Sequence, residues 1–165
     1  MGTEGGLHLM SWLRFMTGSR LAPFVPMPSH VARALLKLAD VGHGDVLYDL
    51  GCGDGRVLKQ ALDMGAERAV GYELNAELAE AARRNTAQYG GRAEVRESDA
   101  NEATLDDASV VTLYLSELGN AKLLPLLERS LSPNARVASF SFVIPGRKHT
   151  ASTRVDGIDL YLYKL

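Results

Sequence analysis

The sequence lacks the features that mark disulfide-bonded, metal-bound and membrane-spanning proteins. Its single cysteine, Cys52, excludes an intrachain disulfide and a cysteine-based metal cage. The four histidines are scattered without an i, i+4 pair, so we expect no metal centre. No run approaches the roughly 20 consecutive apolar residues that span a bilayer. The 18 basic and 20 acidic residues nearly balance, so we expect no nucleic-acid partner.

With 165 residues, of which 46% are hydrophobic, the chain can build one globular core. The N-terminal residues stand apart, because 7–16 are apolar and Arg20 follows them with no acid between. This segment fits an arm packed on the domain, a peripheral membrane contact or a targeting segment. We expect an arm over 1–28 and one domain over 29–165. We also expect a cytoplasmic protein, or a membrane-associated or mitochondrial one if the segment is a signal.

Strand and helix patterns alternate from Val46 onward, as in a parallel sheet with crossover helices. Asp156-Gly157 between two apolar runs predicts a β-hairpin at the end. The sequence predicts an α/β, Rossmann-like, doubly wound fold whose mostly parallel seven-strand sheet ends in an antiparallel hairpin. The predicted strands are 46–50, 69–73, 93–97, 109–115, 136–142, 153–155 and 158–163. The predicted helices are 32–38, with Ser29 as its N-cap, 55–65, 77–89, and 120–131, which must start late or kink to tolerate Pro125.

The most informative segment is the glycine-rich turn after the first predicted strand. Gly51, Gly53 and Gly55 let the backbone turn tightly and let a ligand lie against bare main chain at a helix N-terminus. Glu73 ends the next strand, 22 residues after Gly51, where a carboxylate can accept hydrogen bonds from both ribose hydroxyls. Together they predict an adenosine-containing ligand.

Asp49 decides which adenosine ligand is expected. It stands two residues before the G-x-G-x-G turn, where its carboxylate would repel a diphosphate and attract a cationic amino group. Dinucleotide-binding folds use G-x-G-x-x-G instead. We therefore expect S-adenosyl-L-methionine as cofactor and S-adenosyl-L-homocysteine as product, rather than NAD.

These motifs resemble those of class I S-adenosylmethionine-dependent methyltransferases, most closely the small seven-strand protein lysine methyltransferases of archaeal and mitochondrial ATP-synthase-c-subunit type. The likeness extends over residues 23–165 and is carried by 23–26, 48–56, 110–115, Asn120 and 161–163. It implies that Asp49, Gly51, Gly53 and Gly55 cradle the methionine part and that Glu73 binds the ribose. It further implies that Asp99 receives the adenine amino group between the apolar walls Leu74 and Ala100. The sequence departs from the pattern at Met27 and at 139–141.

The resemblance implies methylation of lysine side chains in a protein substrate, with the acceptor at the end of the fourth strand. There Tyr114 would supply an aromatic wall and an oxygen acceptor, and Glu117 would attract an ammonium. Asn120 would orient the amine, and Ser116 is a further candidate. No Pro-Pro-Tyr box follows this strand, which disfavours methylation of amides and of exocyclic base nitrogens.

Three alternatives remain at this point. A small-molecule methyltransferase would need a closed pocket, built by residues 1–30 or by a second subunit. A cofactor-binding module without turnover is favoured only by the two departures. An NAD-dependent reductase is disfavoured by the glycine spacing and by Asp49.

Overall fold

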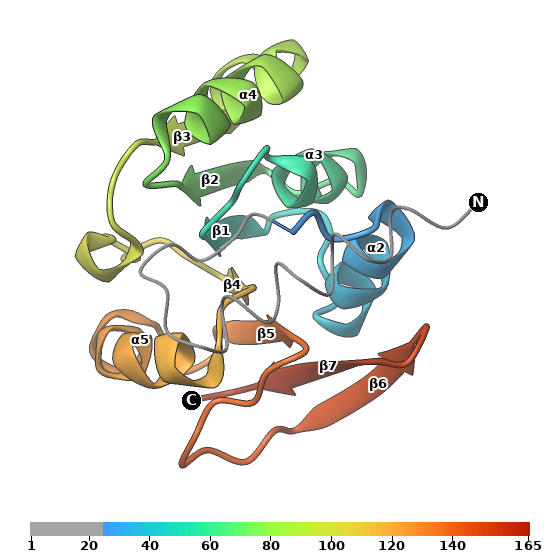
Figure 1. The fold of residues 1–165 in the computed structure, drawn as a ribbon, viewed down its shortest axis with the longest axis vertical. Coiled ribbons are helices and arrows are strands. Elements are labelled where there is room, and N and C mark those ends of the chain that lie inside the picture. Colours follow the sequence, from blue (N-terminus) through green and yellow to red (C-terminus); the bar gives the residue numbers. More distant parts are fainter. Residues whose placement is uncertain (1–24) are drawn as a thin grey trace.

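The computed structural model describes residues 25–165. The predictions for the apolar segment 7–16, and for all but the last residues of the arm over 1–28, lie outside the described residues. Within the described part, seven strands form one sheet in the order β3-β2-β1-β4-β5-β7-β6 (Figure 1). The strands are β1 (Val46–Leu50), β2 (Arg68–Tyr72), β3 (Ala93–Arg96), β4 (Val110–Leu113), β5 (Arg136–Phe140), β6 (Ala151–Val155) and β7 (Ile158–Tyr163).

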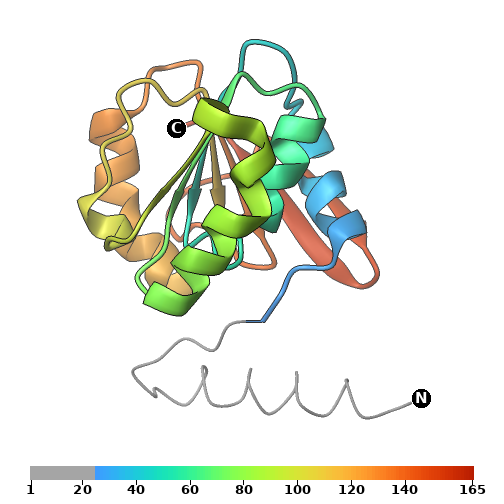
Figure 2. The same ribbon diagram turned by 90° about the horizontal axis from the view of Figure 1, so that it is seen from above.

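Strands β1 to β5 pair in parallel, whereas β7 is antiparallel to both β5 and β6. Helices cover both faces: α2, α3 and α4 lie on one side of the sheet, and α5 with the short η2 lies on the other (Figure 2). The helices are α2 (Ser29–Leu38), α3 (Arg56–Asp63), α4 (Ala76–Thr86) and α5 (Glu117–Ser130), with 3-10 turns η1 (Ala87–Arg92) and η2 (Ala100–Glu102). The predicted fold class is confirmed.

The central strand β1 sets the position of the site. Its near-continuous apolar sequence fits burial on both faces, and four of its five residues are buried. Strand β2 pairs with one side of β1 and β4 pairs with the other side, so the order of the strands reverses at β1. In open α/β sheets such a reversal of strand order leaves a crevice at the carboxyl ends of the strands.

The C-terminal hairpin forms at the predicted turn. Asp156 and Gly157 have φ values of 52° and 77°, and Val155 pairs with Ile158 across the two-residue loop. Two positive φ values are those of a type I′ turn, whose twist matches that of the flanking strands.

Two predicted helix starts are wrong, for local reasons. Helix α2 begins at Ser29, so Pro28 and not Ser29 occupies the N-cap position. Helix α5 begins at Glu117 instead of Asn120, because the Ser116 side chain caps it by accepting a hydrogen bond from Gly119 N (3.0 Å). Consequently Pro125 lies well inside α5, and the late start proposed to accommodate it does not occur.

No helix among residues 25–165 is long and apolar enough to cross a membrane. The same part of the chain holds no group of three His, Cys, Asp or Glu side chains arranged to bind a metal ion.

Packing between β2 and the glycine turn predicts a strong effect for Gly71→Ala. A Cβ at Gly71 would lie 2.5 Å from Cys52 Sγ and 2.8 Å from Leu58 Cδ1, so buried neighbours must move. We expect a loss of about 1–3 kcal/mol in the free energy of unfolding, measured by urea denaturation. Gly42→Ala, where nothing lies within 4 Å, is the control and should change stability by less than about 0.5 kcal/mol. Equal effects of the two substitutions would refute this account.

Candidate active site

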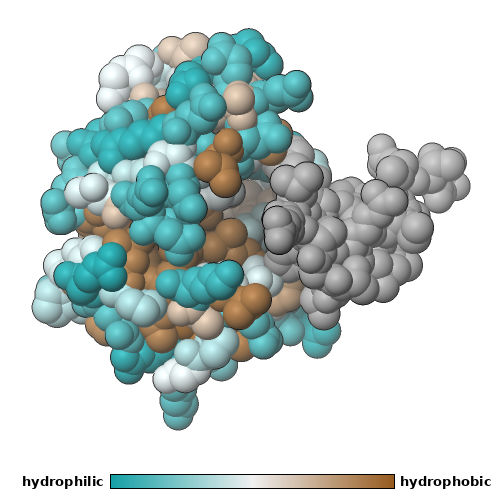
Figure 3. Space-filling model, turned by 60° about the vertical axis from the view of Figure 1, so that its left-hand side comes forward, coloured by the Kyte–Doolittle hydropathy of each residue, from teal (hydrophilic) through white to brown (hydrophobic). Residues whose placement is uncertain are grey.

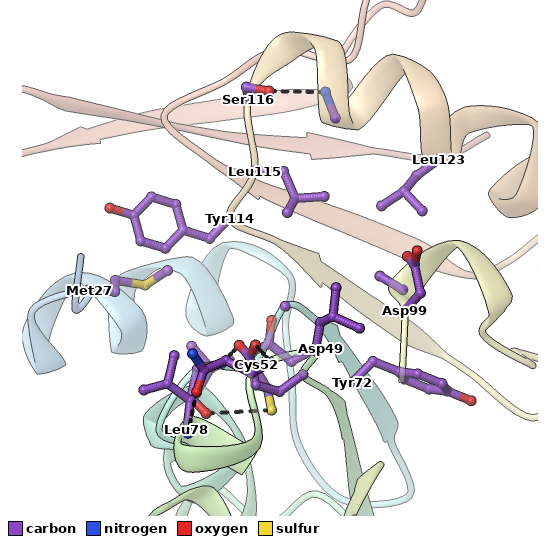
Figure 4. Close-up of a pocket in the computed structure, with 18 of the residues that line it drawn as sticks. Met27, Asp49, Cys52, Tyr72, Leu78, Asp99, Tyr114, Leu115, Ser116 and Leu123 are labelled. Carbon is purple, nitrogen blue, oxygen red and sulfur yellow. Dashed lines mark hydrogen bonds between the residues drawn. The ribbon is translucent and has the colours of Figure 1, made fainter. Parts of the chain in front are cut away.

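A cavity of about 770 Å³ opens at the carboxyl ends of the parallel strands. Hydrophobic residues form a hollowed area between hydrophilic margins on the face shown in Figure 3, and the cavity lining includes the apolar Leu115 and Leu123. In the close-up, Met27 and Tyr114 lie toward one end and Asp99 toward the other (Figure 4). The predicted site residues that line the cavity are Asp49, Gly51, Gly53, Glu73, Leu74, Asp99, Ala100, Tyr114 and Ser116.

The glycine turn forms the wall between β1 and α3. Gly51, Gly53 and Gly55 have φ values of 88°, 55° and 84°, a region that residues with a side chain rarely adopt. Gly55 does not line the cavity; it begins α3 where a Cβ would approach Ala82 Cα to 3.0 Å. Two glycines of the turn therefore face a ligand, and the third allows α3 to pack against α4.

Asp49 lines the cavity between the Tyr114 end and the Asp99 end, with its side chain almost out of contact with water. It is only 4% exposed, and Thr112 Oγ1 donates a hydrogen bond to Asp49 Oδ1 (2.8 Å). Burial, opposed by the Thr112 hydrogen bond and reinforced by the nearby Glu73, raises the pKa of Asp49 to about 7. A buried carboxylate without a cation is unstable, so this position favours a positively charged ligand group.

Glu73 follows β2 and joins it to the glycine turn. Its Oε1 accepts a hydrogen bond from Gly53 N and its Oε2 accepts one from Asn75 N, both at 2.9 Å. These two bonds fix the carboxylate through backbone donors. An ionised carboxylate offers about four acceptor positions, so two remain for the hydroxyls of a bound sugar.

The far end of the cavity is formed after β3. Asp99 Oδ1 accepts hydrogen bonds from the backbone and side-chain nitrogens of Asn101, both at 2.9 Å, and these bonds lower the pKa of Asp99. Its other oxygen is available to an amino group. Leu74, 69% exposed, and Ala100 flank this end as apolar walls.

At the opposite end, Tyr114 follows β4 and is supported by Phe140, whose ring centroid lies 4.2 Å away in an edge-on arrangement. Burial raises the pKa of Tyr114 to about 12, so its hydroxyl is neutral at physiological pH. Met27 also lines this end. Arg56 holds it there, donating one hydrogen bond to Met27 O (3.0 Å) while pairing with Asp54.

Two of the predicted catalytic residues do not line the cavity. Glu117 is exposed at the start of α5. Asn120 is fully buried behind the wall, where its side-chain nitrogen binds the backbone after β5. Because α5 starts earlier than expected, Asn120 faces the core and is in no position to contact an acceptor amine directly.

Sequence reasoning missed several lining residues, notably Phe142, Leu123 and Lys122. Leu123 belongs to the apolar face of α5 that the sequence revealed, but nothing in that pattern distinguishes a cavity wall from a core position. Cys52, by contrast, is buried with its thiol pKa raised by burial, in agreement with a packing role and not that of a nucleophile.

The sheet order, the glycine turn, the acid within β1 and the acids after β2 and β3 define a class I S-adenosylmethionine-dependent methyltransferase. The chain belongs to the family of the ANTKMT methyltransferase domain, whose model matches residues 49–151. The resemblance inferred from the sequence is thereby confirmed.

Curated relatives and a solved structure agree with this assignment. A protein-lysine N-methyltransferase of Saccharolobus islandicus is 41% identical over 75% of this chain and 79% of its own length. The adenine nucleotide translocase lysine N-methyltransferase of Mus musculus is 32% identical over 74% of this chain and 54% of its own. A structure described as an RNA methyltransferase from Salinibacter ruber, in complex with S-adenosyl-L-homocysteine, is 39% identical, with a TM-score of 0.81 over 84% of this chain and 92% of its own.

The cofactor of this class is S-adenosyl-L-methionine, and S-adenosyl-L-homocysteine is its product. The cavity residues fit it on grounds of chemistry. No cation among the described residues neutralises the buried Asp49 carboxyl, and the ammonium of the cofactor would supply one; the bare glycine backbone leaves room beside it. The Asp49 carboxylate would repel a diphosphate.

The raised pKa of Asp49 predicts how stability depends on pH. The pKa of Asp49 is near 3.8 in the unfolded chain and about 7 in the folded protein. Between these two pH values the folded state binds one proton more than the unfolded state, so the contribution of Asp49 to the free energy of unfolding falls as pH rises. At about 1.36 kcal/mol per unit, Asp49 lowers the free energy of unfolding by roughly 4 kcal/mol at pH 8. Asp49→Asn, which keeps the acceptor for Thr112, should match the wild type at pH 4 and exceed it in stability at pH 8.

Urea denaturation of both proteins at pH 4, 6 and 8, without cofactor, measures this difference. Asp99→Asn is the control with the opposite sign. Because the pKa of Asp99 is lowered in the folded protein, this carboxylate stabilises the fold at pH values above its unfolded-state pKa, and that stabilisation is lost on acidification. A difference between Asp49→Asn and the wild type that did not vary with pH would contradict the assignment.

Proposed function

We propose that this protein is a protein-lysine N-methyltransferase, which transfers a methyl group from S-adenosyl-L-methionine to lysine side chains of a protein substrate. The names of its two curated relatives support this substrate class. The observation that carries the proposal is the chemical character of the cavity end at Tyr114, where Met27 also lines the wall. An apolar and aromatic channel accepts the stem of a lysine and favours its neutral amine.

The acids and glycines of the cavity would hold the cofactor. Asp49 would bind its ammonium against the backbone of Gly51 and Gly53, and Glu73 would accept hydrogen bonds from the ribose hydroxyls. Asp99 would accept one from the adenine amino group, with Leu74 and Ala100 on either side of the ring. Asp49 is buried, and the carboxylates of Glu73 and Asp99 are fixed by backbone N–H groups. The site would therefore be organised before the cofactor binds.

When bound, the cofactor supplies an electrophilic methyl group on a sulfonium. The chain's own residues would orient the acceptor and exclude water, which are the main contributions to an in-line displacement. The lysine nitrogen forms its bond to the methyl carbon as the carbon–sulfur bond breaks, and the positive charge passes from sulfur to nitrogen. No base is needed in the cavity if the amine loses its proton to water before it enters.

The Salinibacter ruber structure favours a second candidate, an RNA acceptor, through its description as an RNA methyltransferase. The near-balanced charge of this chain and the absence of a Pro-Pro-Tyr box after β4 favour the protein instead. Product analysis separates the two directly.

The acceptor class predicts the pH dependence of methyl transfer. With saturating tritiated cofactor and limiting acceptor, we expect the rate into the protein fraction of a cell lysate to rise about tenfold per pH unit from 7 to 9. The neutral fraction of a lysine with a pKa near 10.4 grows by that factor. An exocyclic base nitrogen does not titrate in this range, so transfer to RNA would show no such slope.

The same labelled lysate, divided and treated with protease or nuclease, identifies the acceptor. Methyllysine in the acid hydrolysate, and label that protease but not nuclease converts to small fragments, are the expected results. Label that nuclease releases would refute the proposal and establish the RNA acceptor.

The cofactor assignment predicts weaker binding for Glu73→Gln. Losing the charged acceptor for two hydroxyls should raise the dissociation constant for S-adenosyl-L-homocysteine about 10- to 100-fold, measured by isothermal titration. Glu102→Gln, an exposed acid outside the cavity, is the control and should leave binding unchanged. Binding equal to that of the wild type in Glu73→Gln would remove Glu73 from the site.

A further inference from the structure

The backbone just after β5 makes an unusual turn at the edge of the cavity. Phe142 N donates a hydrogen bond to Phe140 O (2.8 Å), and Ser141 between them has a φ of 68°. A γ-turn with positive φ is the rarer and more strained of the two kinds, above all at a residue that is not glycine. The turn carries the chain out of the strand, and Phe142 lines the cavity.

Two fully buried polar side chains hold this turn from behind. Ser139 Oγ donates to Phe142 O at 2.5 Å. Asn120 Nδ2 donates to Phe142 O (3.3 Å), to Val143 O (3.1 Å) and to Ser139 Oγ (3.2 Å). Both Ser139 and Asn120 are 0% exposed.

The orientation of the Asn120 amide follows from its surroundings. Two backbone carbonyls face the amide end that holds Nδ2, and only a nitrogen can donate to them. Asn120 Oδ1 is left buried without a hydrogen-bond partner among the described residues. The structure thus tolerates an unsatisfied oxygen on Asn120 in α5 and a positive φ at Ser141 after β5, both next to the backbone of Phe142.

The same segment supports two aromatic residues of the cavity lining, Tyr114 and Phe142. Phe140 packs against the ring of Tyr114, and Phe142, two residues later, lines the cavity itself. Without the turn at Ser141, strand alternation would send residues 140 and 142 to the same face of the sheet.

We infer that Asn120 and Ser139 are positioning residues that hold the strained turn at Ser141, and that Phe142 is a specificity-determining residue forming the second aromatic wall of the acceptor channel. This inference rests on the proposed lysine acceptor. An aromatic face beside the lysine nitrogen stabilises the positive charge that develops there as the methyl group is transferred.

Ser141→Gly tests the turn without a loss of stability. Glycine adopts a φ of 68° without strain, so the variant should be at least as stable as the wild type, yet its turn is free to leave the native conformation. We expect methyl transfer to fall about tenfold, with the affinity for S-adenosyl-L-homocysteine unchanged and faster hydrogen exchange over residues 142–144. Asp40→Gly is the matched control, since Asp40 also has a positive φ, 53°, at a site remote from the cavity.

Phe142→Leu and Ser139→Ala test the wall and its support. Single-turnover methyl transfer is measured with the nuclease-treated protein fraction as acceptor, at several concentrations of that fraction. The measurement separates the half-saturating acceptor concentration from the limiting rate. We expect Phe142→Leu to raise the half-saturating concentration about tenfold. Ser139→Ala should lower the limiting rate with cofactor affinity retained. Thr86→Val, which removes a buried hydroxyl from α4, controls for the loss of a buried hydrogen bond.

The outcomes are separable. A wild type that labels no protein refutes the proposed function, and this inference with it. The inference alone is overturned by a different result, in which the wild-type protein labels protein and the Ser141→Gly and Phe142→Leu variants show the same rate and the same half-saturating concentration as the wild type. The inference is also overturned if cofactor affinity falls in these variants as much as transfer does.

Discussion

The buried carboxyl of Asp49 is the constraint on which the rest of the site depends. It is the last residue but one of the inner strand β1, is almost without water, and has only Thr112 as a side-chain hydrogen-bond partner among the described residues. Such a carboxyl is tolerated in two ways: it takes up a proton, or a cation joins it. The glycine turn beside it leaves the bare backbone that a cationic ligand needs in order to approach. The charge selectivity of the cavity therefore comes from burial of one acid rather than from the number of acids present.

Within residues 25–165, little chain lies outside the sheet and its helices to cover the site. The crevice is formed by the reversal of strand order at β1 and β4, and the segment at Met27 adds a wall from outside these elements. Arg56 attaches that segment to the glycine turn through Met27 O and Asp54. One arginine thus connects the cofactor end of the cavity to the Met27 and Tyr114 end, and a macromolecular acceptor can close what remains.

The fold and the cofactor end could be predicted from the sequence because their signals are local. Strand, glycine turn and acid follow one another at fixed spacing, and each strand places its acid at the same edge of the sheet. The other end could not be predicted in this way. The Ser116 cap moved the start of α5 by three residues and turned Asn120 into the core. Phe142 reaches the cavity only through a turn that Ser139 and Asn120 hold, and these contacts join residues about 20 positions apart.

Several departures from ideal structure lie near the cavity. The buried carboxyl of Asp49, the unpartnered oxygen of Asn120 and the positive φ of Ser141 each lower stability, and all lie at or just behind its wall. Others lie away from it: among the described residues the buried Nε of Arg68 also lacks a partner, and Asp40 also has a positive φ. A chain selected for stability alone would replace the unfavourable groups first. The buried Asp49 carboxyl is the one of these groups that lines the cavity itself, so it is the departure that function best explains.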